Sequence, residues 1–165
     1  MKDIFKPKQR IFVAGSSNEP TALLAELQPM ELPEHLEFVQ FPLAGFNTID
    51  FTQFNETSIL TTFFMTPSLR QADPSRLHFL PMQMRSVYDY LKQGIDVVLF
   101  QVGYDQLGNL RLGPNVDFIE AALQSASVWI AELNRSFVAP FGSIAIDRSC
   151  LLYTSPSPRD LSTSR

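Results

Sequence analysis

The chain has 165 residues, of which 45% are hydrophobic and 18% are charged, and its formal net charge is −4. This length and composition are those of one globular domain that can bury a core. The negative net charge argues against a surface for nucleic acid or acidic membranes, because both need a basic patch. No apolar run reaches the ~20 residues of a membrane helix, and no signal peptide precedes Val13. We therefore expect a cytoplasmic protein with neither nucleic acid nor membrane as a partner.

The first predicted unit is a strand over residues 10–14, a small polar loop over 15–18 and a helix from Glu19-Pro20 to Leu27. Proline is favoured in a first helical turn, and the loop's serine and asparagine residues are good helix caps. A strand, a small polar loop and a helix N-terminus also make a favourable place for an anion. The loop is therefore either a helix cap alone or a site for a phosphorylated ligand.

The next elements alternate between strands and short helices. Alternating or continuous apolar runs predict strands over residues 36–41, 58–64 and 77–82. Helices are predicted near 67–70 and over 86–93, where Gly94 is a suitable C-cap. The loop after the first of these strands contains Gly45 and Phe46, and Phe46 either packs on the core or forms part of a ligand wall.

Residues 96–118 contain the strongest strand signal of the chain and predict the centre of the sheet. Residues 97–102 form a continuous apolar run rich in β-branched side chains, which is typical of a strand buried on both faces. Residues 110–112 are predicted as a hairpin arm, and Asn115 as the cap of a helix over 116–125. With a last strand over 127–133, this alternation indicates a mostly parallel α/β sheet with flanking helices. Gln101 then lies near a glycine-rich rim at the carboxyl end of its strand, where open α/β sheets bind ligands.

No complete catalytic constellation is present, so no catalytic residue and no metal ligand is predicted. His35 and His78 lie in different segments and lack the spacing of a catalytic triad. The glycine patterns of dinucleotide and P-loop sites are absent. Glu19 is the best-placed carboxylate for chemistry, although a role at the helix N-terminus explains it equally well. The single cysteine, Cys150, excludes an intramolecular disulfide and a multi-cysteine metal site.

The last sixteen residues differ in composition from the rest of the chain. Residues 150–160 read CLLYTSPSPRD and are followed by a Ser/Thr-rich end. They resemble the translation, from its second base, of a transposon-end adapter used in DNA sequencing. We therefore expect residues 150–165 to be an artefactual, disordered tail and residues 1–149 to be a fragment of a longer natural protein.

Several stretches in a fixed order resemble the N-terminal domain of the acetyl-CoA hydrolase/transferase family, the relatives of 4-hydroxybutyrate CoA-transferase. The Glu19-Pro20 pair resembles a GEP-like element in which Asn18 replaces a frequent glycine. Gln101-Val102 resembles the end of the family's central strand, although Gly103-Tyr104 then departs from its usual Ser-Pro or Pro-Pro. The matching stretches are VAGSSNEPTALLAEL (13–27), LAGFNTIDF (43–51), FFMTPSLR (63–70), HFLPMQMRSVYDYL (78–91), DVVLFQVGYDQLGNLRLGPNVDF (96–118) and SVWIAELN (127–134).

The resemblance implies a NagB/RpiA/CoA-transferase-like fold, here truncated at its C-terminal end, in an enzyme of two similar α/β halves. In that family a glutamate attacks an acyl-CoA thioester, and the cycle proceeds through a glutamyl-CoA thioester. The resemblance places this glutamate in the missing C-terminal half, so the fragment alone is expected to be inactive. It implies acyl-CoA and a small carboxylate as substrates, coenzyme A as substrate rather than cofactor, and a possible homo-oligomer for the full-length enzyme.

The N-terminal half is expected to supply walls of the acyl pocket from its strand-end loops. The candidate substrate-binding residues are Gly15, Ser16, Asn18, Glu19, Gly45, Phe46 and Gln101. Two functions remain open at this point. The first is half of a CoA-transferase or acyl-CoA hydrolase, and the second is a non-enzymatic α/β module that binds a small phosphorylated ligand at the loop from Gly15 to Glu19.

Overall fold

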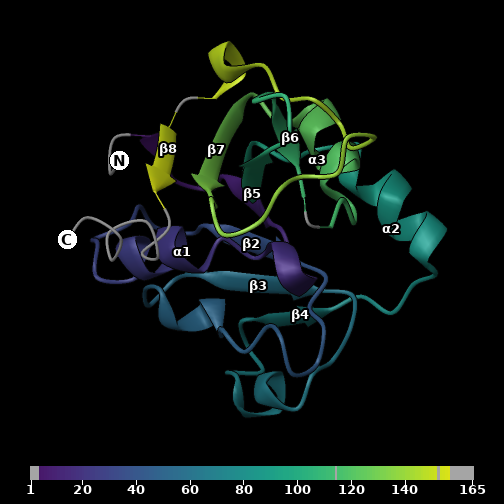
Figure 1. The fold of residues 1–165 in the computed structure, drawn as a ribbon. Helices are drawn as coiled ribbons and strands as arrows, with labels where there is room; N and C mark the ends of the chain where they lie inside the picture. Colours follow the sequence, from purple (N-terminus) through teal and green to yellow (C-terminus); the bar gives the residue numbers. More distant parts are fainter. Residues whose placement is uncertain (1–3, 114, 152, 157–165) are drawn as a thin grey trace.

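The apolar runs of the sequence form one β-sheet with helices on both faces (Figure 1). The computed structural model describes residues 4–113, 115–151 and 153–156. The strands are β1 (Arg10–Val13), β2 (Glu37–Gln40), β3 (Ile59–Thr62), β4 (Leu77–Phe79), β5 (Val97–Tyr104), β6 (Leu110–Leu112), β7 (Val128–Leu133) and β8 (Tyr153–Pro156). The helices are α1 (Thr21–Leu27), α2 (Met84–Leu91) and α3 (Ile119–Ser125), with short 3-10 turns η2 (Ser16–Asn18), η3 (Phe51–Gln53), η4 (Ser68–Gln71) and η5 (Arg148–Cys150).

The sheet has the order β4-β3-β2-β1-β5-β7-β8, and all neighbours along this path are parallel. β6 pairs antiparallel with β5 as a hairpin. From β1 the chain builds the sheet outward through β2, β3 and β4, and then returns to place β5 on the other side of β1. The strand order therefore reverses between β1 and β5, which is where open α/β sheets form ligand crevices at their carboxyl edge.

Alternate residues of β5 feed two separate hydrophobic cores. Val98 and Phe100 join the core that includes Ile119 of α3, whereas Val97 and Leu99 join the core that includes the leucines of α1. This alternation is the two-residue period of a strand that is buried on both faces. The chain is thus a three-layer α/β fold, as the sequence predicted.

The order of strands and helices predicted from the sequence is confirmed, with two differences at the central stretch. β5 continues through Gly103 to Tyr104, because its hairpin partner β6 pairs with these residues. α3 begins at Ile119 rather than at 116, and Asn115 does not cap it. Instead the Asn115 Oδ1 atom accepts a hydrogen bond from the backbone N–H of Asp117, whose φ of 44° lies in the left-handed region and delays the helix.

The C-terminal segment also differs from the prediction. Tyr153–Pro156, expected to be disordered, pairs as strand β8 along β7 with Ile130 opposite Tyr153. Strand pairing uses backbone groups, so almost any sequence can cover the free edge of β7. The origin of the segment in an adapter therefore stays a prediction, and residues 157–165 lie outside the described part of the chain.

No helix among the described residues combines the length and the hydropathy needed to cross a lipid bilayer.

Candidate functional site

A buried polar network joins β5 to the loop that follows β1. The Gln101 Nε2 atom donates a hydrogen bond of 2.6 Å to the carbonyl oxygen of Glu19, and the Gln101 Oε1 atom accepts one of 3.1 Å from Asn134. Gln101 is buried, so these partners satisfy an amide that would otherwise be costly to bury. The network lies at the switch between β1 and β5 and fixes the path of the chain there.

The carboxyl group of Glu19 is turned inward. Glu19 is only 5% exposed, and its Oε1 atom accepts a hydrogen bond of 2.9 Å from the side chain of Gln40 at the end of β2. Burial raises the pKa of Glu19, while hydrogen bonds from Gln40 and Asn47 act in the opposite direction. A carboxyl group held in this way orders the loop and lies beneath the surface of the rim.

A second link joins the loop after β1 to the turn after β2. The Asn47 Oδ1 atom accepts hydrogen bonds from the backbone N–H groups of Ser16 (2.7 Å) and Leu43 (2.8 Å), and the Asn47 Nδ2 atom donates to the Ser16 carbonyl oxygen (3.1 Å). The backbone also approaches closely here, because a Cβ atom on Gly15 would lie 2.1 Å from the carbonyl oxygen of Phe41. These contacts join the two strand-end loops to each other.

The turn held by Asn47 presents an aromatic side chain to solvent. Gly45 adopts a φ of 84°, which a glycine allows, and the neighbouring Phe46 is 61% exposed. Other large exposed apolar side chains in the described part of the chain follow or end the parallel strands in the sequence. They are Leu43, Phe64, Phe79, Met84, Leu107, Val138 and Phe141. We call the strand-end loops that carry these side chains the apolar rim.

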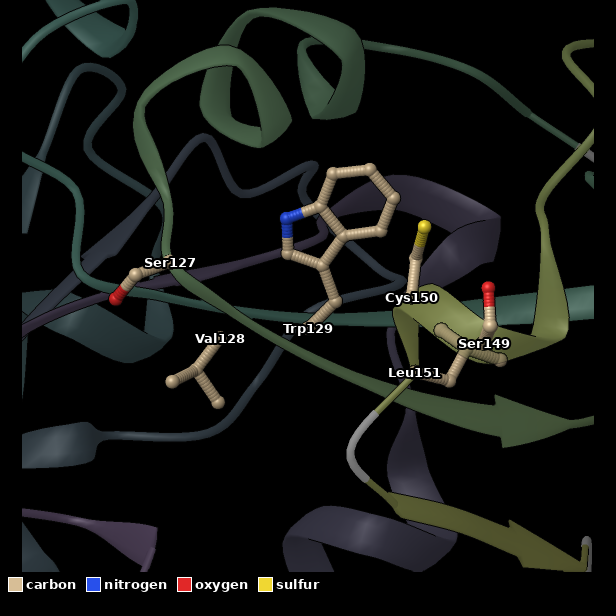
Figure 2. Close-up of a pocket in the computed structure, with 6 residues that line it drawn as sticks. All are labelled: Ser127, Val128, Trp129, Ser149, Cys150 and Leu151. Carbon is tan, nitrogen blue, oxygen red and sulfur yellow. The ribbon is translucent and has the colours of Figure 1, made fainter.

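Two cavities lie at the opposite edge, where the parallel strands begin. One of about 160 Å³ is formed by the start of β7, including Trp129, and by residues 149–151 (Figure 2). A wider one of about 510 Å³ lies beside Arg10, at the first residue of β1. The guanidinium group of Arg10 already bonds Glu37, Tyr90 and the Gly94 carbonyl oxygen.

The start of α1 is occupied by a carboxylate of the chain itself. The Glu132 Oε2 atom accepts hydrogen bonds from the backbone N–H groups of Ala22 (2.9 Å) and Leu23 (3.1 Å). A phosphorylated ligand would need these same N–H groups. The geometry therefore argues against the phosphate-binding role considered for the loop from Gly15 to Glu19.

The structure brings the predicted site residues together in two parts. Gly15, Ser16, Asn18, Glu19 and Gln101 belong to the loop after β1 and to its support, and all except the half-buried Ser16 are buried. Gly45 and Phe46 are exposed on the adjoining turn. Sequence reasoning missed four polar residues that hold this unit together, namely Gln40, Asn47, Glu132 and Asn134. A polar side chain at or near the end of an apolar strand, as at Gln40 and Glu132, was the available signal.

The described residues contain no group of three or more His, Cys, Asp or Glu side chains suited to a metal ion. His35 and His78 are exposed and belong to different segments, so neither joins the buried network.

Comparisons with known proteins support the fold but not a family. The chain resembles the crystal structure of RipA from Yersinia pestis, with a TM-score of 0.76 and 20% identity over 93% of this chain and 40% of that one. It also resembles a 4-hydroxybutyrate CoA-transferase from Porphyromonas gingivalis, with a TM-score of 0.62 and 20% identity over 94% of this chain and 36% of that one. No protein-family model and no curated protein sequence matches the chain. The chain thus has a CoA-transferase-like α/β fold and spans about two fifths of the length of these neighbours.

Proposed function

We propose that this chain forms one wall of the active-site cleft of a CoA-transferase or acyl-CoA hydrolase. The reactive glutamate belongs to a second α/β unit outside this chain, and the substrates are an acyl-CoA and a small carboxylate, or water in a hydrolase. The fold similarity to a 4-hydroxybutyrate CoA-transferase supports this proposal. The sequence stretches that resemble the acetyl-CoA hydrolase/transferase family, which occur in a fixed order, support it independently.

One observation carries the proposal: the polar network and the exposed apolar side chains share the carboxyl edge of the sheet. The network around Gln101 makes the loops rigid, and Phe46 and Phe64 offer apolar surface beside it. Patches of exposed apolar side chains mark interaction surfaces or ligand-binding sites. The best-placed carboxyl, that of Glu19, is buried and hydrogen-bonded, which supports a nucleophile supplied by the second unit.

In the proposed reaction, a glutamate carboxylate of the second unit attacks the thioester carbonyl of the acyl-CoA. The C–S bond breaks, CoA leaves as a thiolate, and an acyl-glutamyl anhydride forms. The thiolate then attacks the glutamyl carbonyl, which releases the original acid as a carboxylate and leaves a glutamyl-CoA thioester. A second carboxylate, or water, completes the cycle. This chain contributes the rim against which the acyl group packs.

The sharpest test is to recover the coding DNA that follows codon 149 in the source and to express the extended protein. We expect a second α/β unit with a catalytic glutamate and acyl-CoA turnover that is lost when this glutamate becomes glutamine. The 165-residue chain alone is the matched control and should show no turnover above background. Robust turnover by the chain alone would overturn the placement of the nucleophile.

Calorimetric titration of the 165-residue chain addresses the competing function. Sugar phosphates should not bind tightly, because Glu132 occupies the N–H groups of Ala22 and Leu23. Tight binding of a sugar phosphate, together with an extended protein that lacks activity on acyl-CoA, would favour the phosphate-binding module instead.

A further inference from the structure

The turn between β1 and α1 is fixed at both ends by side chains from other elements, whereas its middle is held by one backbone hydrogen bond. At one end, the side chain of Asn47 bonds both the backbone N–H and the carbonyl oxygen of Ser16. At the other end, Gln101 bonds the carbonyl oxygen of Glu19, and Gln40 bonds its carboxyl group. Between these anchors lie only Ser17 and Asn18. Any rearrangement that leaves the anchors in place is therefore confined to these two residues.

Asn18 is in an unfavourable position. Its side chain is 0% exposed, and neither its Oδ1 nor its Nδ2 atom has a hydrogen-bond partner among the described residues. A buried amide with no partner loses its hydration without compensation. The backbone next to it is also unusual, because Ser16 has a φ of 53°, in a region that residues other than glycine rarely adopt. The bonds to Asn47 hold Ser16 in this conformation, so only the penalty at Asn18 is relieved when the anchors stay in place.

We propose that this turn is a two-state element in which Asn18 leaves its buried position and turns its carboxamide out onto the rim. The change breaks the hydrogen bond of 3.1 Å between the Asn18 N–H and the Gly15 carbonyl oxygen. It restores hydrogen bonding to both amide atoms of the side chain, which offsets the loss of that backbone bond. Penalties of this kind cluster at switch regions, where the surrounding structure holds them in place.

The outward state gives the rim a neutral hydrogen-bonding group beside the turn that carries Phe46. A carboxamide offers both a donor and an acceptor, so it suits an amide or a hydroxyl group of a bound molecule. A ligand that bonds Asn18 in the outward state and makes no such bond in the inward state shifts the population outward. The two states of this turn are a property of the chain itself and do not depend on which reaction the complete protein performs.

The test is ¹⁵N relaxation dispersion on the 165-residue chain, which detects minor states of about 1–10% population. We expect millisecond exchange at the backbone nitrogens of Ser17 and Asn18 and none at Ser16 or Glu19. The variant Asn18→Leu replaces the amide with an apolar group of similar shape. It should abolish the exchange and raise Tm by about 2–4 °C. The matched control Ser17→Ala, at the exposed residue of the same turn, should keep the exchange.

Three kinds of result would overturn the proposal. The first is a wild-type chain without exchange at Ser17 and Asn18. The second is an Asn18→Leu variant that keeps the exchange, since the exchange would then not arise from the buried amide. An Asn18→Leu variant that melts at a lower temperature or fails to fold would also overturn the proposal, because the amide would then stabilise the observed turn. Hydrogen exchange of the wild-type chain gives a second measurement, in which the backbone N–H of Asn18 should exchange faster than that of Ser16.

Discussion

The carboxylate of Glu132 caps a helix that lies 110 residues earlier in the chain, with its Oε2 atom 2.9 Å from the backbone nitrogen of Ala22. α1 has only seven residues and no side-chain cap of its own at Pro20. A negative charge at a helix N-terminus is also favourable to the helix dipole. β7 therefore supplies the side-chain cap that the local sequence of α1 lacks. This contact connects the start of α1 to a strand that is separated from β1 by β5.

Replacing Glu132 with alanine should destabilise the chain by about 1–3 kcal/mol, because the N–H groups of Ala22 and Leu23 stay buried and lose their acceptor. Urea unfolding followed by circular dichroism measures this loss as a lower midpoint. The matched variant Glu132→Gln keeps an acceptor oxygen and should lose less. Equal losses in the two variants would show that the negative charge, rather than the acceptor geometry, is what α1 needs.

The sequence predicted the fold well because the signals for its elements are local. β5 has a continuous apolar run, β2 has an alternating one, and Pro20 marks the start of α1. The alternation of strands and helices then limits the sheet to mostly parallel arrangements. The boundaries were less certain at α3, where the left-handed conformation of Asp117 delays the helix by three residues.

The candidate site was harder to predict because its contacts join distant parts of the chain. Gln101 was singled out from its strand, but its bond to Glu19 follows only once β1 and β5 are neighbours in the sheet. Glu132 reaches α1 in the same way, through strand order. Asn47 lies in a loop where its sequence neighbours give no sign that it will bond Ser16. Sequence patterns identify the strand ends, whereas register and strand order decide which polar side chains meet.

Asp117 should make stability depend on pH. Burial raises the pKa of Asp117 to about 6, against 3.8 for an ordinary aspartate. Between these values the folded chain holds more protons than the unfolded one, so the stabilisation present below pH 3.8 is lost as the pH rises through 6. Asp117→Asn keeps a side chain that tolerates the left-handed φ of 44° but does not ionise.

Urea unfolding from pH 4 to pH 7.5 tests this sign directly. As the pH rises, the wild type should lose stability relative to Asp117→Asn, so the free energy of unfolding of the variant minus that of the wild type should increase. This difference should level off above pH 7. Gln93→Ala, at an exposed position whose side chain does not ionise, is the control and should give a curve parallel to that of the wild type. Parallel curves for Asp117→Asn as well would contradict a raised pKa at Asp117.

Gly15 should be one of the least replaceable residues of the loop after β1. A Cβ atom there would lie 2.1 Å from the Phe41 carbonyl oxygen, so the two strand-end loops would have to separate. Gly15→Ala should therefore lower the free energy of unfolding by about 3 kcal/mol. Gly142→Ala is the matched control, because a Cβ atom on Gly142 meets nothing within 4 Å. Similar midpoints for the two alanine variants would mean that the loops are less tightly joined than their contacts indicate.

Phe46 tests the apolar rim itself. Because its ring is mostly in solvent, Phe46→Ser should change the free energy of unfolding by no more than about 0.5 kcal/mol. We expect the chain to self-associate in sedimentation velocity through its exposed apolar side chains, and Phe46→Ser should weaken this association because it removes apolar surface from the turn. Phe46→Tyr keeps the ring and should associate like the wild type. A serine variant that associates equally strongly would exclude this turn from the contact surface. A large loss of stability would mean that Phe46 supports the fold, which its exposure to solvent argues against.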